Sequence, residues 1–96
     1  MSVSAEAIAR RLVIAGRVQG VGFRYAFADE ARVHRLAGWV RNRRDGTVEA
    51  LVSGPALAVE AIITWARVGP AAARIASVEV EEAIAASGAF EILATL

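Results

Sequence analysis

Residues 10–31 read RRLVIAGRVQGVGFRYAFADEA, and within this stretch the spacing of the apolar residues changes from that of a strand to that of a helix. Residues 10–18 are rich in aliphatic and β-branched side chains, which predicts a strand. From Phe23 onward apolar side chains recur every four residues, which predicts a helix. A glycine-rich turn therefore joins a strand directly to a helix.

This turn, residues 16–24, has the features of an anion-binding loop. Backbone N–H groups at a helix start lack intrahelical acceptors and carry positive partial charge. Gly20 and Gly22 allow the backbone to approach a ligand closely, and Arg24 can donate two N–H groups to a phosphate or carboxylate. The loop lacks the Gly-Lys-Ser/Thr of a P-loop, and Tyr25 stands where a dinucleotide-binding turn needs a small residue. A simple tight turn fits the same residues.

The rest of the chain predicts the remaining elements of a small α+β domain. Arg44-Asp45-Gly46 is a hairpin signal, and Gly54-Pro55 and Gly69-Pro70 bound a second helix. Further strands are expected at residues 36–43, 47–53 and 75–82, with a short one around residues 90–92. The order β-α-β-β-α-β predicts a ferredoxin-like antiparallel sheet with both helices on one face and a possible short fifth strand. In the second helix, the residues expected to face the core are Leu57, Ala61, Ile62, Trp65 and Val68.

Composition narrows the class of protein. Ninety-six residues predict a single domain over residues 1–96. Hydrophobic residues make up 56%, yet no apolar run approaches the roughly 20 residues of a membrane span. Residues 1–9 lack the pattern of a secretory signal, and the absence of cysteine fits a reducing cytoplasm. A net charge of +1 is too balanced for a general nucleic-acid binder.

A second polar motif follows the first helix: Gly38-Trp39-Val40-Arg41-Asn42 places an asparagine near the end of a predicted strand. Asparagine in such a position commonly bonds to local backbone. Packing is the expected role of Trp39. A basic patch formed by Arg41, Arg43 and Arg44 would attract a small anion, although solvated strand faces explain these charges equally well.

Together, GRVQGVGFR at residues 16–24 and GWVRN at residues 38–42 closely resemble the two signatures of the acylphosphatase family. Further matching positions extend the resemblance from about residue 12 to residue 92. They are Ser53-Gly54-Pro55, Trp65, Gly69-Pro70, Ala73-Arg74-Ile75 and Phe90-Glu91-Ile92. The resemblance implies a ferredoxin-like hydrolase that cleaves small acyl phosphates to carboxylate and phosphate without a metal or other cofactor.

The resemblance also implies roles for particular residues. Arg24 would bind the phosphoryl group, and Asn42 would orient the attacking water. The backbone of the loop would complete the phosphate site through Gln19, Gly20, Val21, Gly22, Phe23 and Arg24. When an acyl phosphate is hydrolysed, the leaving group is a carboxylate, and its departure needs no strong general acid. Positioning of the substrate and stabilisation of charge can therefore supply the catalysis.

We expect a monomer that binds neither nucleic acid nor membrane. A non-enzymatic module that binds small anions for regulation is the alternative, since the loop alone would serve it. An acylphosphatase-like domain of a carbamoyl-transferring maturation factor is a further alternative, but those proteins carry cysteine-based zinc motifs and this chain has no cysteine. RNA binding through aromatic side chains on central strands is not expected, because residues 10–18 and 47–53 contain none.

The chain departs from the family at the end of the first helix. His34 stands where the family usually has an aliphatic residue, and Arg35 where it usually has glycine. A glycine there would suit a left-handed helix terminus, a conformation that costs another residue about 1–2 kcal/mol. His34 is expected to pack or to lie at the rim rather than to act in catalysis.

Overall fold

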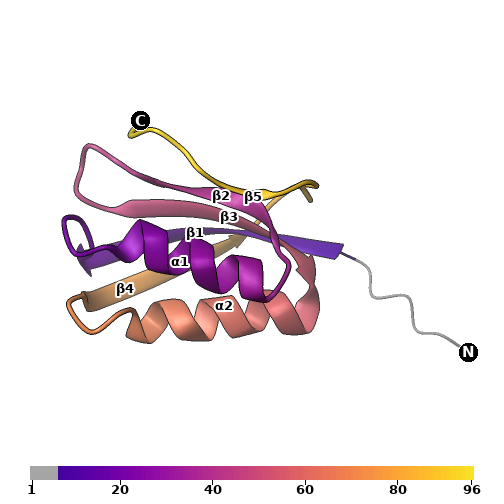
Figure 1. The fold of residues 1–96 in the computed structure, drawn as a ribbon, viewed down its shortest axis with the longest axis horizontal. Coiled ribbons are helices and arrows are strands. Elements are labelled where there is room, and N and C mark those ends of the chain that lie inside the picture. The colour runs from indigo at the N-terminus through magenta and orange to yellow at the C-terminus, as the bar shows by residue number, and fades with distance from the viewer. Residues whose placement is uncertain (1–6) are drawn as a thin grey trace, which may run out of the picture.

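The computed structural model describes residues 7–96 and contains seven helices and strands in the predicted order (Figure 1). They are β1 (Ala7–Arg17), α1 (Phe23–Val33), β2 (Ala37–Asn42), β3 (Val48–Pro55), α2 (Ala56–Val68), β4 (Arg74–Glu82) and β5 (Phe90–Ile92). The single domain predicted over residues 1–96 stays a prediction at its boundaries, since residues 1–6 lie outside the described part.

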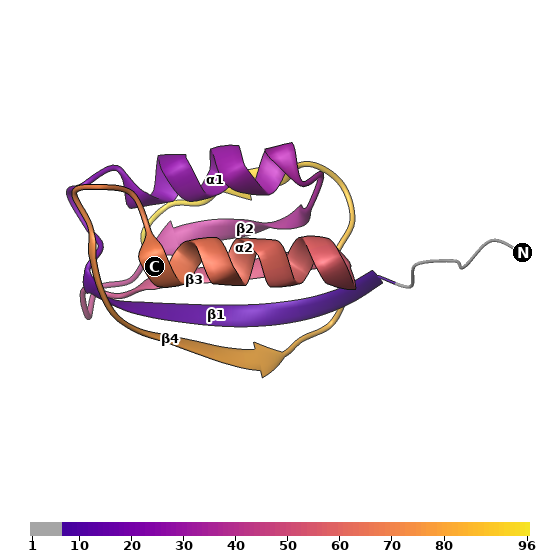
Figure 2. The same cartoon turned by 90° about the horizontal axis from the view of Figure 1, so that it is seen from below.

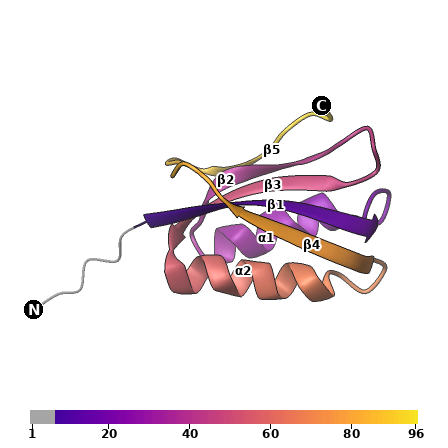
Figure 3. The same ribbon diagram turned by 180° about the vertical axis from the view of Figure 1, so that it is seen from behind.

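The strands form one sheet in the order β4-β1-β3-β2-β5. The first four pair antiparallel, which confirms the ferredoxin-like expectation, whereas β5 runs parallel to β2 and makes the sheet mixed. The cause is the connection after β4, which crosses to the other edge of the sheet (Figure 3). Two hydrogen bonds hold this crossing, from Ala83 N–H to the Ala9 carbonyl (3.2 Å) and from Ala86 N–H to Ser53 Oγ (3.1 Å).

Both helices cover the same face of the sheet, as predicted (Figure 2). Because side chains alternate along a strand, every second residue of β1 and β3 points toward the helices. The fully buried residues of this set are Leu12, Ile14, Val48, Ala50 and Val52. The Phe27 ring of α1 lies 5.9 Å from the rings of both Trp65 and Phe90, measured between centroids. This aromatic contact locks α1, α2 and β5 together.

The prediction for the buried face of α2 was partly wrong. Ile62 is buried as expected, but Leu57 and Val68 are 81% and 75% exposed. The residues that face the sheet are Val59, Ile62 and Ala66. Apolar residues surround most of this helix, so their spacing alone does not select a face. Within residues 7–96, no helix is both long and apolar enough to cross a membrane.

The first helix ends at a left-handed residue that is not glycine. Arg35 has φ of 55° and follows the C-cap residue His34. Its N–H donates to the Arg32 carbonyl (3.0 Å), and the Leu36 N–H donates to the Ala31 carbonyl (2.9 Å). This pair of bonds is the Schellman motif, whose left-handed position favours glycine. The structure therefore confirms the conformation expected from the family comparison and assigns it to an arginine.

The sheet face away from the helices carries a row of paired charges. Glu49 is only 5% exposed and accepts hydrogen bonds from Arg11 Nε (2.6 Å) and Arg41 Nε (2.9 Å). Arg11 also donates to Glu81 (2.8 Å), and the Arg41 guanidinium lies 4.6 Å from the centre of the Trp39 ring. Burial alone raises the pKa of Glu49, but the bonds from Arg11 and Arg41 outweigh it and leave that pKa below its ordinary value.

Candidate anion site at the start of helix α1

Two glycines shape the loop between β1 and α1. Gly20 and Gly22 have φ of 71° and 76°, in the left-handed region that other residues rarely adopt. Gly22 is also the N-cap residue of α1, and no side chain caps the helix there. A Cβ added at either glycine would meet no atom within 4 Å. The glycines are thus needed for backbone conformation, and the surface beside them is open.

The backbone of this loop carries a run of unpaired donors. Among the described residues, the N–H groups of residues 19–25 have no hydrogen-bond acceptor, and the first bond of the helix is from Ala26 N–H to the Gly22 carbonyl (3.1 Å). Val21 and Phe23 anchor the loop by packing their side chains against the core. Free N–H groups and the positive end of the helix dipole together favour an anion.

Gln19 ties the loop to the β2–β3 hairpin. Its side-chain Nε2 donates to the carbonyls of Arg43 (2.7 Å) and Thr47 (3.0 Å). The sequence indicated only a backbone role for this residue, so its anchoring role was missed. The available signal was a long amide side chain in a loop otherwise made of glycine and valine. Through these bonds the loop sits against the residues that follow Asn42.

Asn42 is the last residue of β2, and its side-chain carbonyl oxygen is buried without a partner among the described residues. It shares the helix-facing side with Val40, which is fully buried, and it pairs with Val48 across the sheet. Its Oδ1 atom is buried without a hydrogen-bond partner in the part of the chain that the structure describes. A buried polar atom without a partner costs about 1–3 kcal/mol. A bound water would satisfy this acceptor.

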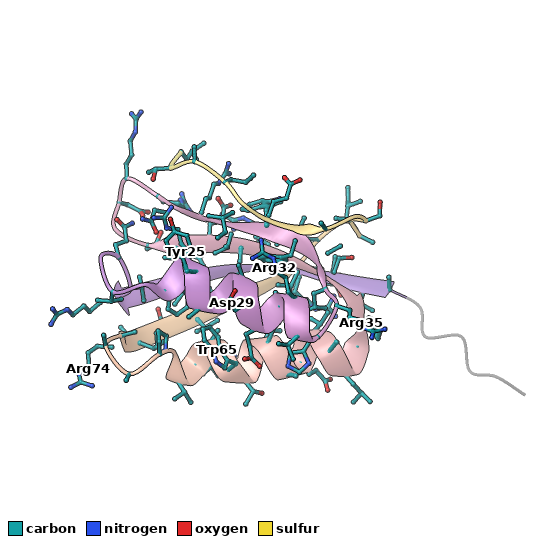
Figure 4. The ribbon with its side chains drawn as sticks, viewed as in Figure 1. Tyr25, Asp29, Arg32, Arg35, Trp65 and Arg74 are labelled. Carbon is teal, nitrogen blue, oxygen red and sulfur yellow. The ribbon has the colours of Figure 1, made fainter. Side chains whose placement is uncertain are left out.

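Arg24 is the second residue of α1 and is half-buried. Its guanidinium lies 5.7 Å from the centre of the Tyr25 ring, and Figure 4 places Tyr25 near the start of the helix. No carboxylate among residues 7–96 forms an ion pair with Arg24. Its five N–H donors are therefore available to an external oxyanion.

The sheet topology brings the predicted site residues, 19–24 and Asn42, to one end of the molecule. The loop, the first turn of α1 and Asn42 lie where β1 finishes and the β2–β3 hairpin turns. His34 lies at the opposite end of α1, with Nε2 3.3 Å from Glu30. In the described range no three His, Cys, Asp or Glu side chains are grouped to hold a metal. Arginine, asparagine and backbone amides are among the groups that this end offers to a ligand.

Comparisons with known proteins agree with this architecture. The Acylphosphatase family model matches residues 10–92. An acylphosphatase of Acidovorax sp. (strain JS42) is 57% identical over 83 residues, which are 86% of each chain. The crystal structure of acylphosphatase from Bacillus subtilis has a TM-score of 0.84 at 39% identity and covers 90% of this chain and 98% of its own. Full-length HypF, in a phosphate- and nucleotide-bound form, reaches a TM-score of 0.89 at 28% identity, but only 13% of that chain is covered. The chain belongs to the acylphosphatase family.

Proposed function

We propose that residues 19–24 bind the phosphoryl group of a small acyl phosphate while Asn42 holds the water that attacks it. Membership of the acylphosphatase family supplies the reaction class, hydrolysis of an acyl phosphate to a carboxylate and phosphate. One observation carries the assignment of roles: the buried, unpartnered Oδ1 of Asn42 lies at the same end of the sheet as the free N–H groups of the loop.

The chemistry follows from these groups. Arg24 and the loop amides spread positive charge over the phosphoryl oxygens, which carry the charge of the transition state. The water donates one hydrogen to Asn42 Oδ1, which turns an oxygen lone pair toward phosphorus. As the new P–O bond forms, the bond to the acyl oxygen breaks and a carboxylate leaves. The water's second proton passes to solvent, so no side chain has to act as a general base, and the leaving carboxylate is stable without a general acid.

Arg24→Lys tests the phosphate-binding role. Lysine keeps the charge but loses the planar fork that binds two oxygens, so we expect kcat/KM for benzoyl phosphate to fall about 10²–10³-fold. Arg44→Lys is the matched control, because Arg44 is exposed in the hairpin turn, and it should keep its activity. Near-normal turnover by Arg24→Lys would overturn the assignment.

Asn42→Ala tests the water-binding role separately. We expect kcat to fall by about 10²–10³-fold, while the inhibition constant of inorganic phosphate stays nearly unchanged. Equal loss of turnover and of phosphate inhibition would instead make Asn42 a phosphate-binding residue.

Regulatory anion binding is the second candidate, because the unpaired amides of the loop would serve it without catalysis. Benzoyl phosphate hydrolysis by the folded protein in the presence of EDTA separates the two. We expect turnover that EDTA does not reduce. Phosphate binding without turnover would favour the regulatory module, and inhibition by EDTA would contradict the metal-free mechanism. A monomeric state and a cytoplasmic location remain parts of the proposal, the first open to a measurement of mass in solution.

A further inference from the structure

Two arginines oppose each other directly where β1 and β4 meet beside the loop. Arg17, the last residue of β1, pairs with Arg74, the first residue of β4. The pairing depends on a bulge after Ala15, which leaves Ala76 without a partner and shifts the register by one residue. Without the bulge Arg17 would face Ile75. Bulges commonly redirect side chains next to functional sites.

The close approach of the strands explains how the bulge is accommodated. Gly16 faces Ile75 with φ of 124°, and a Cβ at Gly16 would lie 2.1 Å from the Arg74 carbonyl oxygen. Only glycine fits there without movement of β4. The Ile75 side chain packs against the core, so its neighbour Arg74 points to the opposite face of the sheet, which it shares with Arg17.

The two guanidinium groups lack acidic neighbours. Both residues are exposed, and neither forms an ion pair with any carboxylate of the described chain. By contrast, Arg11 and Arg41 on the same face are both bonded to Glu49. Like charges directly opposite each other destabilise a strand pair, so packing and pairing do not account for this arrangement. A negatively charged ligand bound between the two guanidinium groups would account for it.

The position of Arg17 and Arg74 beside the β1–α1 loop indicates what kind of ligand they bind. Arg17 precedes Gln19 by two residues, and Figure 4 shows Arg74 projecting from the end of the molecule where the β1–α1 loop lies. Building on the proposed function, we infer that Arg17 and Arg74 bind a second negative group of the substrate. The favoured substrates are then acyl phosphates whose acyl part carries a carboxylate or a second phosphate. Guanidinium groups suit both, since their paired N–H donors match two oxygens.

Matched substrates test this subsite. Succinyl phosphate and butyryl phosphate have acyl chains of equal length, as do glutaryl and valeryl phosphate, and only the first of each pair has a terminal carboxylate. We expect the protein to favour the carboxylate member in at least one pair. The ratio of the two kcat/KM values is the readout, because any effect on the shared phosphoryl group cancels. Each of Arg17→Gln and Arg74→Gln should lower the ratio about 1.5-fold to fivefold, the range of an exposed ion pair.

The control removes a charge from the other end of the molecule. Arg35 is exposed and lies far from Arg74 (Figure 4), so Arg35→Gln should leave the ratio unchanged. The preference should also weaken as salt rises from 20 to 200 mM in the unchanged protein but not in the double variant. Turnover of the uncharged members without any preference, or a preference that survives in the double variant, overturns the subsite alone. Failure to hydrolyse any of the four compounds overturns the proposed function itself.

Discussion

Replacing Arg35 by glycine should relieve strain in the backbone, since Arg35 occupies the left-handed position of the Schellman motif that ends α1. An L-residue in this conformation pays about 1–2 kcal/mol because its Cβ crowds the backbone. Glycine avoids that penalty, and both hydrogen bonds of the motif are made by the backbone and remain. The exposed side chain of Arg35 has no ion-pair partner among residues 7–96.

Two opposing effects reduce the gain. Glycine is more flexible in the unfolded chain, which offsets about 0.4–1 kcal/mol. Removing a positive charge near a helix C-terminus loses a further 0.3–1 kcal/mol or so. Arg35→Ala loses the same charge but keeps a Cβ, so comparing the two variants isolates the backbone effect. We therefore expect the unfolding free energy of Arg35→Gly to exceed that of Arg35→Ala by about 1 kcal/mol.

Urea unfolding followed by tryptophan fluorescence measures this difference, because Trp65 packs in the aromatic core. Thermal unfolding is an independent check, and a difference of 1 kcal/mol corresponds to about 4–8 °C for a domain of this size. Equal stability of the two variants, or a less stable Arg35→Gly, would refute the claim that position 35 is strained. Activity toward benzoyl phosphate should be the same in both, since position 35 lies at the far end of α1 from the loop.

Three further changes test other contacts. Glu49 has a lowered pKa in the fold, so its ion pairs contribute fully above its ordinary pKa of 4.5 and are lost as the pH falls through the folded value. Acidification from pH 5 to pH 3 should thus reduce the unfolding free energy of the unchanged protein more than that of Glu49→Gln. An equal decrease in both proteins would contradict this. Gln19→Ala removes both side-chain hydrogen bonds to the hairpin, and we expect a higher KM and a loss of about 1–2 kcal/mol in stability. An unchanged KM would show that the loop keeps its position without these bonds. Phe27→Ala should lower the unfolding free energy measured in urea by about 3–5 kcal/mol, because Phe27 is fully buried. A loss below about 1 kcal/mol would mean that neighbouring side chains fill the cavity.

Local patterns in the sequence were sufficient for most of the fold. The change of period around the glycine turn indicated β1 and α1, and the Asp45-Gly46 turn indicated the β2–β3 hairpin. These features depend on residues close together in the chain, so their physical causes are visible in the sequence. The apolar surface of α2 was ambiguous for the opposite reason. Leu57 and Val59 are both apolar, and only docking on the sheet decides which of them is buried.

The features of the site can also be divided into those that follow from local sequence and those that depend on contacts between distant segments. The unpaired amides and Arg24 follow from the glycines and the helix start, and the two family signatures named Asn42 as their companion. The bonds from Gln19 to the hairpin could not be predicted, because they join segments more than twenty residues apart. The burial of the Asn42 side-chain carbonyl could not be predicted either, because it arises from tertiary packing.

By itself, the sequence determined the turns, the caps, the order of elements and the family, because each rests on backbone preferences or motifs of a few consecutive residues. The tertiary structure alone decided the parallel pairing of β5, the buried face of α2 and the opposition of Arg17 to Arg74. Each of these depends on strand register or packing between distant segments. Local conformational preferences do not specify such pairings, since the free energy that selects them arises only when the segments meet.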